Sequence, residues 1–189
     1  NKNFKDIVLS SKSNFSFDIS NKIKISNLKF SSKVNLKEAD YLLDSKTFKK
    51  YLPEIEDKIS FLNHVIDIRY DKKILLKGLG NIQIGKKENE INYDLELNKN
   101  KIKYDLGIDL NQTLFQIDVI NYSKKSNEVA KVKILGESTN LNYLVKKIIL
   151  ETKDSIFSLN NFDISKNFKI TDFEKVNFDY LDNNQRKND

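Results

Sequence analysis

The sequence predicts a mainly β protein, a curved, folded-over antiparallel sheet with one or two short helices. Apolar and polar residues alternate with a period of two along most of the 189-residue chain, which is typical of strands that bury one face. Short polar turns such as Asp71-Lys72-Lys73 and Gly85-Lys86-Lys87 separate the alternating runs. Neighbouring strands are therefore expected to pair as antiparallel hairpins.

The clearest hairpin lies in residues 90–110, EINYDLELNKNKIKYDLGIDL. Apolar side chains occupy every second position on either side of the polar break Asn98–Lys101. Because successive side chains of a strand point to opposite faces, one face of this hairpin is expected to be apolar and the other polar. Similar alternation predicts further strands within residues 14–30, 65–84, 114–119, 129–135 and 155–180.

Two stretches depart from this alternation. Residues 36–52, LKEADYLLDSKTFKKYL, space their apolar side chains closer to helical periodicity and predict a helical insertion. Asp44 or Ser45 is expected to cap a second short helix there that ends before Pro53. Residues 140–151 are ambiguous, and their β-branched side chains favour a strand.

The composition points to a lysine-rich solvated surface. The formal net charge is +6, and only Arg69 and Arg186 are arginines among 33 basic residues. Lysine is less suited than arginine to bidentate recognition of phosphates or bases. The aromatic side chains Phe15, Phe17 and Tyr93 alternate with aliphatic rather than basic residues, unlike a base-stacking platform. We therefore expect no nucleic-acid partner.

The sequence also lacks the residues that most catalytic and metal sites need. It contains no cysteine and one histidine, His64, which is expected to be a structural or surface residue rather than a catalytic one. Asp105 and Asp109 would share the polar face of a strand with lysines and are expected to be solvated cross-strand partners. Gly78-Leu79-Gly80 precedes no helical pattern and is not a phosphate-binding loop. We predict no enzyme, no metal and no cofactor.

The predicted sheet carries a broad apolar face that must be covered. Exposed apolar patches larger than a few hundred Å² are rare in soluble monomers. A second sheet, closure into a barrel, a helix from residues 36–52 or a bound lipid could each cover the face. One short helix covers only a few strands, so a folded-over sheet with an apolar interior is the simplest solution.

The order of these motifs resembles a known family. The helical insertion that ends in LPEIEDKISFL (Leu52–Leu62), KILLKGLGNIQI (Lys73–Ile84), VAKVKILGES (Val129–Ser138) and FKITDFEKVNFDY (Phe168–Tyr180) are similar to AsmA-like proteins. They look most like the large envelope proteins of the YhdP and TamB type, in a bacterium with an AT-rich genome. The resemblance covers most of the chain and rests on spacing rather than on signature residues.

This resemblance implies an open β-groove that conducts phospholipid acyl chains between the inner and outer membranes. It implies a periplasmic location for a parent protein that is anchored in the inner membrane. Because the sequence begins at Asn1 and has no Met, we expect residues 1–189 to be a single groove segment of a longer chain. Contact with membranes would then involve parts outside this sequence. The positions that match the groove lining are Ile91, Tyr93, Leu95, Leu97, Ile102, Tyr104, Leu106, Ile108, Leu110, Ile117 and Val119.

A second hypothesis fits the same alternation. The chain could be a structural or adhesive all-β domain whose apolar faces pack only against each other and bind no ligand. The two hypotheses differ in whether the apolar face borders an open slot or a filled interior.

Overall fold

The computed structural model describes residues 3–139, 142–165 and 170–187. Its elements follow in chain order: β1 (Phe4–Ile19), β2 (Ile25–Leu42), α1 (Lys46–Lys49), β3 (Lys58–Asp71), β4 (Lys73–Ile84), β5 (Lys87–Asn98), β6 (Lys101–Asp109), β7 (Phe115–Ile117), the 3-10 turn η1 (Asp118–Ile120), β8 (Tyr122–Lys124), β9 (Ala130–Ser138), β10 (Asn142–Thr152), β11 (Ile156–Ser165) and β12 (Ile170–Asp179).

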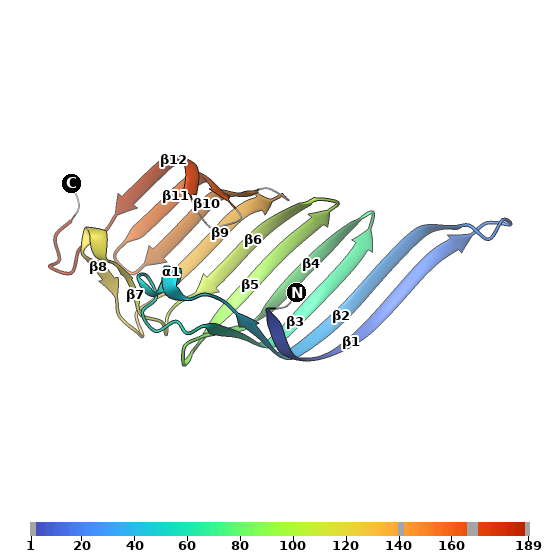
Figure 1. Cartoon of the computed structure of the whole chain (residues 1–189), viewed down its shortest axis with the longest axis horizontal. Coiled ribbons are helices and arrows are strands. Elements are labelled where there is room, and N and C mark those ends of the chain that lie inside the picture. Colours follow the sequence, from blue (N-terminus) through green and yellow to red (C-terminus); the bar gives the residue numbers. More distant parts are fainter. Residues whose placement is uncertain (1–2, 140–141, 166–169, 188–189) are drawn as a thin grey trace.

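Within the described ranges, ten strands form one antiparallel sheet in the order β1-β2-β3-β4-β5-β6-β9-β10-β11-β12, and β7 pairs with β8 separately. Figure 1 shows β1 and β12 at opposite ends of this row, so the sheet is not closed into a barrel. The predicted mainly β fold, an antiparallel sheet that is not closed into a barrel and is accompanied by a short helix, is confirmed. The hairpin predicted in residues 90–110 is formed by β5 and β6, whose register pairs Tyr93 with Leu106 and Leu95 with Tyr104.

The helical insertion predicted for about residues 36–52 is mostly wrong. Strand β2 continues to Leu42, and its residues pair with β1 on one side and β3 on the other. The only α-helix among the described residues is the single turn α1, with Ser45 at its N-cap position. The Ser45 hydroxyl does not cap this helix but donates to Asp57 Oδ1 at 2.5 Å. The strand predicted in residues 140–151 is confirmed as β10, while residues 140 and 141 lie outside the described ranges.

The hydrophobic core occupies one end of the sheet. Two connections fold back over the apolar face there: residues 43–57, between β2 and β3, and residues 110–129, between β6 and β9. Figure 1 shows α1 and β7 side by side at this end, and the Gln116 N–H donates to the Tyr51 carbonyl at 2.9 Å. We call this region the covered end. Its buried residues are Ile55, Ile82, Ile84, Ile91, Leu110, Tyr122, Ala130, Leu150 and Phe157.

Candidate functional site

The other half of the same sheet face carries apolar side chains that no second layer of the described residues covers. Residues paired directly across antiparallel strands share a face, and the register places Leu97 beside Ile102 and Ile74, and Leu106 beside Ile134. We call this surface the open strip. Its residues are Ile66, Ile68, Tyr70, Ile74, Leu76, Leu95, Leu97, Ile102, Tyr104, Leu106, Ile134, Ile148 and Leu159.

Side chains of the open strip are half-buried by their neighbours or exposed. Ile74 and Ile102, near the hairpin turns, are 36% and 38% exposed, whereas Ile91 at the covered end is 7% exposed. Among the described elements, extensive contacts join only strands adjacent in a sheet, together with β8 and η1. The strip therefore borders neither a second sheet nor a long helix of the described chain. Towards β10 and β11 it ends against Val145 and Phe162, which are buried.

The eleven predicted lining residues divide between these two regions. Five of them lie on the open strip: Leu95, Leu97, Ile102, Tyr104 and Leu106. Five belong to the core at the covered end or pack against it: Ile91, Tyr93, Ile108, Leu110 and Ile117. The eleventh, Val119, is corrected by the structure. It lies on η1, outside the large sheet, and is 96% exposed, so it cannot line a face of that sheet.

The two tyrosines predicted in the lining lie over glycines of neighbouring strands. A Cβ atom on Gly136 would lie 2.7 Å from Tyr104 Cζ, and a Cβ on Gly78 would clash with Cζ, Cε2 and the hydroxyl of Tyr93. The Tyr104 hydroxyl donates to the Leu144 carbonyl at 3.3 Å. The pairing of these glycines with tyrosines was not predicted, although glycine opposite an aromatic residue is a known strand pairing. The Tyr104 hydroxyl is occupied by its bond to the Leu144 carbonyl and the Tyr93 hydroxyl by a hydrogen bond with His64, so both rings present mainly carbon.

His64 links the open strip to the covered end. Its side chain is 1% exposed, and its Nε2 lies 2.9 Å from the Asn81 carbonyl, which requires Nε2–H as the donor. Nδ1 then accepts a hydrogen bond from the Tyr93 hydroxyl at 3.0 Å. Burial lowers the pKa of His64 and raises the pKa of Tyr93 to about 12. This arrangement supports the predicted structural role of His64.

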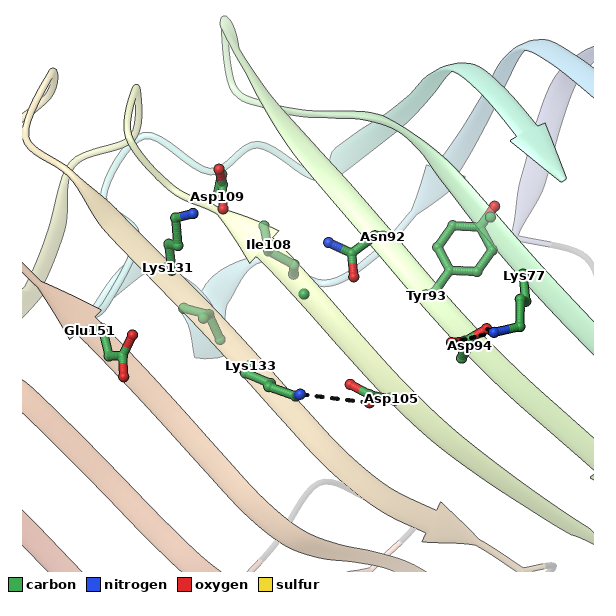
Figure 2. Close-up of a pocket in the computed structure, with 13 residues that line it drawn as sticks. Lys77, Asn92, Tyr93, Asp94, Asp105, Ile108, Asp109, Lys131, Lys133 and Glu151 are labelled. Atoms are coloured by element: carbon green, nitrogen blue, oxygen red, sulfur yellow. Dashed lines mark hydrogen bonds and ion pairs between the residues drawn. The ribbon is translucent and has the colours of Figure 1, made fainter.

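The opposite face of the sheet is mostly polar and carries cross-strand ion pairs, although Val65, Leu75 and Leu79 are exposed there. Glu96 accepts from Lys73 at 2.7 Å and pairs with Lys103 at 3.3 Å, which lowers the pKa of Glu96. A hollow of about 460 Å³ lies on this face. The ion pair of Asp105 with Lys133 spans β6 and β9 at 3.8 Å beside it, and Figure 2 shows the residues that line the hollow. These contacts match the solvated cross-strand role predicted for Asp105. The hollow lies on the face opposite the open strip.

Polar contacts hold the covering segments in place at the covered end. Lys124 is 1% exposed, and its ammonium donates to the Leu110 carbonyl at 2.5 Å and to the Asn111 and Glu128 carbonyls at 3.2 Å. No feature of the sequence distinguished Lys124 from the other lysines. Its burial lowers the pKa of the ammonium.

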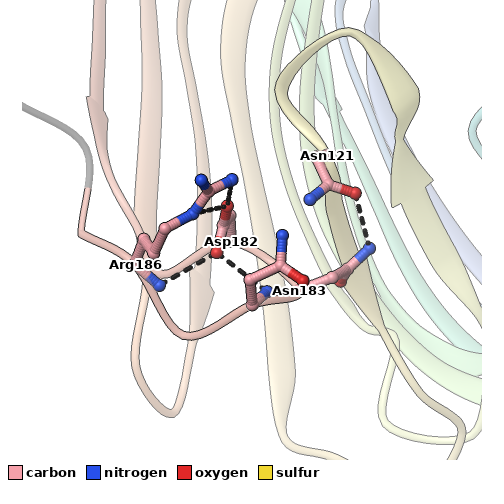
Figure 3. A network of polar contacts seen from close by, with 5 residues as sticks. Asn121, Asp182, Asn183 and Arg186 are labelled. Atoms are coloured by element: carbon pink, nitrogen blue, oxygen red, sulfur yellow. Dashed lines mark hydrogen bonds and ion pairs between the residues drawn. The ribbon is translucent and has the colours of Figure 1, made fainter.

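The segment after β12 is held against β8 and η1 by the contacts in Figure 3. Asn183 accepts from the Ser123 N–H at 2.9 Å. Asp182 accepts backbone and side-chain hydrogen bonds from Arg186, which lowers the pKa of Asp182 to about 2. This polar clasp and Lys124 stabilise the small β7–β8 sheet that covers the core.

No group of three or more potential metal-ligating side chains occurs among the described residues. In the same ranges, no helix has the length and hydropathy needed to cross a membrane. Comparison of the chain with protein-family models, with curated proteins and with solved structures finds no match. Fold and site together define a class: an open, single-layer antiparallel sheet with one apolar face covered at one end only.

Proposed function

We propose that this chain is a non-enzymatic lipid-binding segment whose open strip holds phospholipid acyl chains. The observation that carries the proposal is the uncovered apolar surface between β3 and β11. At about 4.8 Å per strand, these seven strands extend over about 29 Å. The strip has two or three side chains on each of β3 to β6 and one on each of β9 to β11, and each of these thirteen side chains occupies about 4.8 by 6.6 Å of the sheet face. The resulting area of about 400 Å² is within the range of the largest apolar patches on soluble monomers, which often are functional.

The chemistry of the strip favours a hydrocarbon ligand over an extended peptide. Strand backbones in the middle of the sheet already bond to neighbours on both sides, and the Tyr104 hydroxyl bonds to Leu144. A peptide laid across the strip would bury amide groups without partners, at a cost of about 1–3 kcal/mol each. An acyl chain has no such groups and gains from apolar burial alone.

The wider cellular role follows from the resemblance to AsmA-like proteins. We propose that the chain is a groove segment of a periplasmic envelope protein, anchored in the inner membrane through parts outside this sequence. In this role it would conduct phospholipids between the inner and outer membranes without turnover, metal or cofactor. The open edges of the sheet at β1 and β12 support this proposal because further strands could extend the groove.

Lipid mass spectrometry of the protein purified from cells tests the proposal. We expect about one phospholipid per open strip, and saturable uptake of a fluorescent fatty acid by protein from which the lipid has been removed. Leu106→Glu should abolish uptake because it places a carboxylate in the strip. Leu79→Glu is the matched control: Leu79 is 51% exposed on the opposite face, and uptake should be unchanged.

Absence of both co-purified lipid and fatty-acid uptake in the folded protein would refute the proposal. That outcome would favour the structural or adhesive domain, which the packed core at the covered end also supports. Equal loss of uptake in the Leu106 and Leu79 variants would show that the ligand does not occupy the strip.

A further inference from the structure

The hairpin formed by the ends of β1 and β2 projects beyond the sheet. The last contact of β2 with β3 pairs Phe30 with Tyr70, whereas β1 and β2 continue to pair as far as Ile19 and Ile25. Residues 16–29 therefore have no neighbouring strand on the β3 side, and Figure 1 shows this hairpin extending past the other turns. We call residues 16–29 the projecting hairpin.

The projecting hairpin exposes apolar side chains on all sides. Every residue from 16 to 29 is exposed, and Ile23 at the tip is 85% exposed. Its other apolar side chains are also accessible: Phe17 38%, Ile19 61%, Ile25 62% and Leu28 47%. Isolated two-stranded hairpins are marginally stable in water, so such a concentration of exposed apolar residues calls for a partner.

The backbone conformation at the hairpin tip indicates that the side chain of Ile23 has a functional role. Ile23 adopts a φ of +57°, in the left-handed region that disfavours β-branched residues. The turn between β4 and β5, at the opposite end of the sheet, places Gly85 at a φ of +59°. Glycine would fit the hairpin tip with less strain, yet an isoleucine with a nearly fully exposed side chain stands there. Strain of this kind is more often found at functional positions.

Two lysines flank the exposed isoleucine. Lys22 and Lys24 adjoin Ile23 in the turn, and no described side chain forms an ion pair with either ammonium. Asp18, the one acidic residue of the projecting hairpin, accepts a hydrogen bond from Asn27 at 2.6 Å. Residues 16–29 therefore carry three lysines and one aspartate. An exposed apolar side chain between two lysines complements a partner that has anionic groups at its surface and hydrocarbon beneath them.

We propose that the projecting hairpin docks onto an anionic lipid bilayer, with Ile23 inserted below the head groups and Lys22 and Lys24 against the lipid phosphates. Membrane-surface segments generally combine apolar burial with attraction between lysines and anionic lipids. Docking would place the first strands of the sheet beside the bilayer. This inference does not depend on acyl-chain binding by the open strip, because it concerns different residues at one end of the sheet.

Tryptophan fluorescence tests the insertion directly, because the chain contains no tryptophan. Ile23→Trp places a single probe at the tip, and Val119→Trp is a control because Val119 is 96% exposed on η1. With vesicles of phosphatidylcholine and phosphatidylglycerol, the emission of Ile23→Trp should shift to the blue and be quenched by lipids brominated on their acyl chains. The Val119→Trp emission should not change. An unshifted Ile23→Trp emission would overturn the proposal.

Vesicle sedimentation separates the contribution of apolar insertion to binding from that of the lysines. Ile23→Gly removes the side chain and suits the positive φ, so the fold is retained while affinity falls at least about tenfold. Lys22→Gln and Lys24→Gln should each weaken binding to anionic vesicles about fivefold, whereas Lys86→Gln, in the turn that contains Gly85, should have no effect. Unchanged binding in the Ile23 and lysine variants, or equal affinity for pure phosphatidylcholine, would contradict the proposal.

Two further outcomes would assign the projecting hairpin a partner that is not a bilayer. A blue shift of Ile23→Trp that appears on raising the protein concentration without vesicles, together with a dimer in analytical ultracentrifugation, would replace the bilayer by a second copy of the chain. Inhibition of vesicle binding by low concentrations of inorganic phosphate would show that the lysines recognise free phosphate. Fatty-acid uptake by the open strip should be unchanged in the Ile23 variants, so failure of one proposal is distinguishable from failure of the other.

Discussion

Because the apolar face is divided into a covered end and an open strip, replacing an apolar residue by Glu should lower the free energy of unfolding by different amounts on β5 and β6. Ile91 is 7% exposed within the core, so Ile91→Glu must bury a carboxylate without a partner. Loss of the apolar side chain together with this desolvation should cost at least about 4 kcal/mol. Leu106 is half-buried between Tyr93 and Ile134. Its replacement by Glu leaves the carboxylate in contact with water and should cost at most about 2 kcal/mol.

Urea unfolding of lipid-free protein, followed by circular dichroism and tyrosine fluorescence, measures both values. A domain whose free energy of unfolding is about 5–15 kcal/mol retains its fold after the smaller loss, which is expected for Leu106→Glu. It is close to unfolding after the larger loss, which is expected for Ile91→Glu. Equal losses for Leu106→Glu and Ile91→Glu, within about 0.5 kcal/mol, would show that the strip is an ordinary core covered by something else. The open strip could then no longer be regarded as an uncovered surface able to bind lipid.

Three further predictions concern the residues that shape the face. Lys124→Met leaves three carbonyls without their ammonium donor and should lower the free energy of unfolding by about 2–4 kcal/mol in urea titrations. Burial lowers the pKa of His64, so between its unfolded pKa of about 6.5 and the lower folded pKa the unfolded chain binds more protons. The contribution of His64 to the free energy of unfolding is complete above about pH 6.5 and is lost as the pH falls. Urea unfolding measured from about pH 8 to about pH 5.5 should show this decline. In His64→Gln the decline should be smaller. Gly136→Ala places a Cβ 2.3 Å from the Leu144 carbonyl and should lower the melting temperature by several degrees, equivalent to about 1–3 kcal/mol.

The alternating pattern was sufficient to predict most of the strands, because a period of two has one structural interpretation when many hairpins follow one another. The first ten residues of β1 (Phe4–Ile19) were not predicted. The pattern failed in residues 36–43, where Leu36, Ala39 and Leu42 also fit helical spacing and helix-forming residues dominate. Strands on both sides of β2 offer hydrogen bonds to this segment, and that long-range pairing overrides local propensity. Neither neighbour is visible in a local window of the sequence.

The sequence could not distinguish the two halves of the apolar face, since Leu106 and Ile108 belong to one alternating run. Their difference arises from residues far away in the chain: Ile55 and Tyr122 pack in the core that Ile108 contacts. Lys124 illustrates the same limit. Only the folded loop brings three carbonyls around its ammonium, and no local pattern encodes that geometry.

The lengths of the connections explain why one half of the face is covered and the other is open. At the open end, β3 and β4 are joined through Lys72 alone and β5 and β6 through Lys99 and Asn100. Such turns are too short to fold back over a sheet. At the covered end, residues 43–57 and 110–129 are long enough to do so, and they carry the apolar side chains that complete the core. Because antiparallel hairpins alternate their ends, lengthening a turn at the open end is the one local change that could cover the strip. Replacing Lys99-Asn100 by a segment patterned like residues 43–57 should therefore bury Leu97 and Ile102 and abolish fatty-acid uptake while raising the stability. Unchanged uptake in a folded variant of this kind would place the ligand away from the strip.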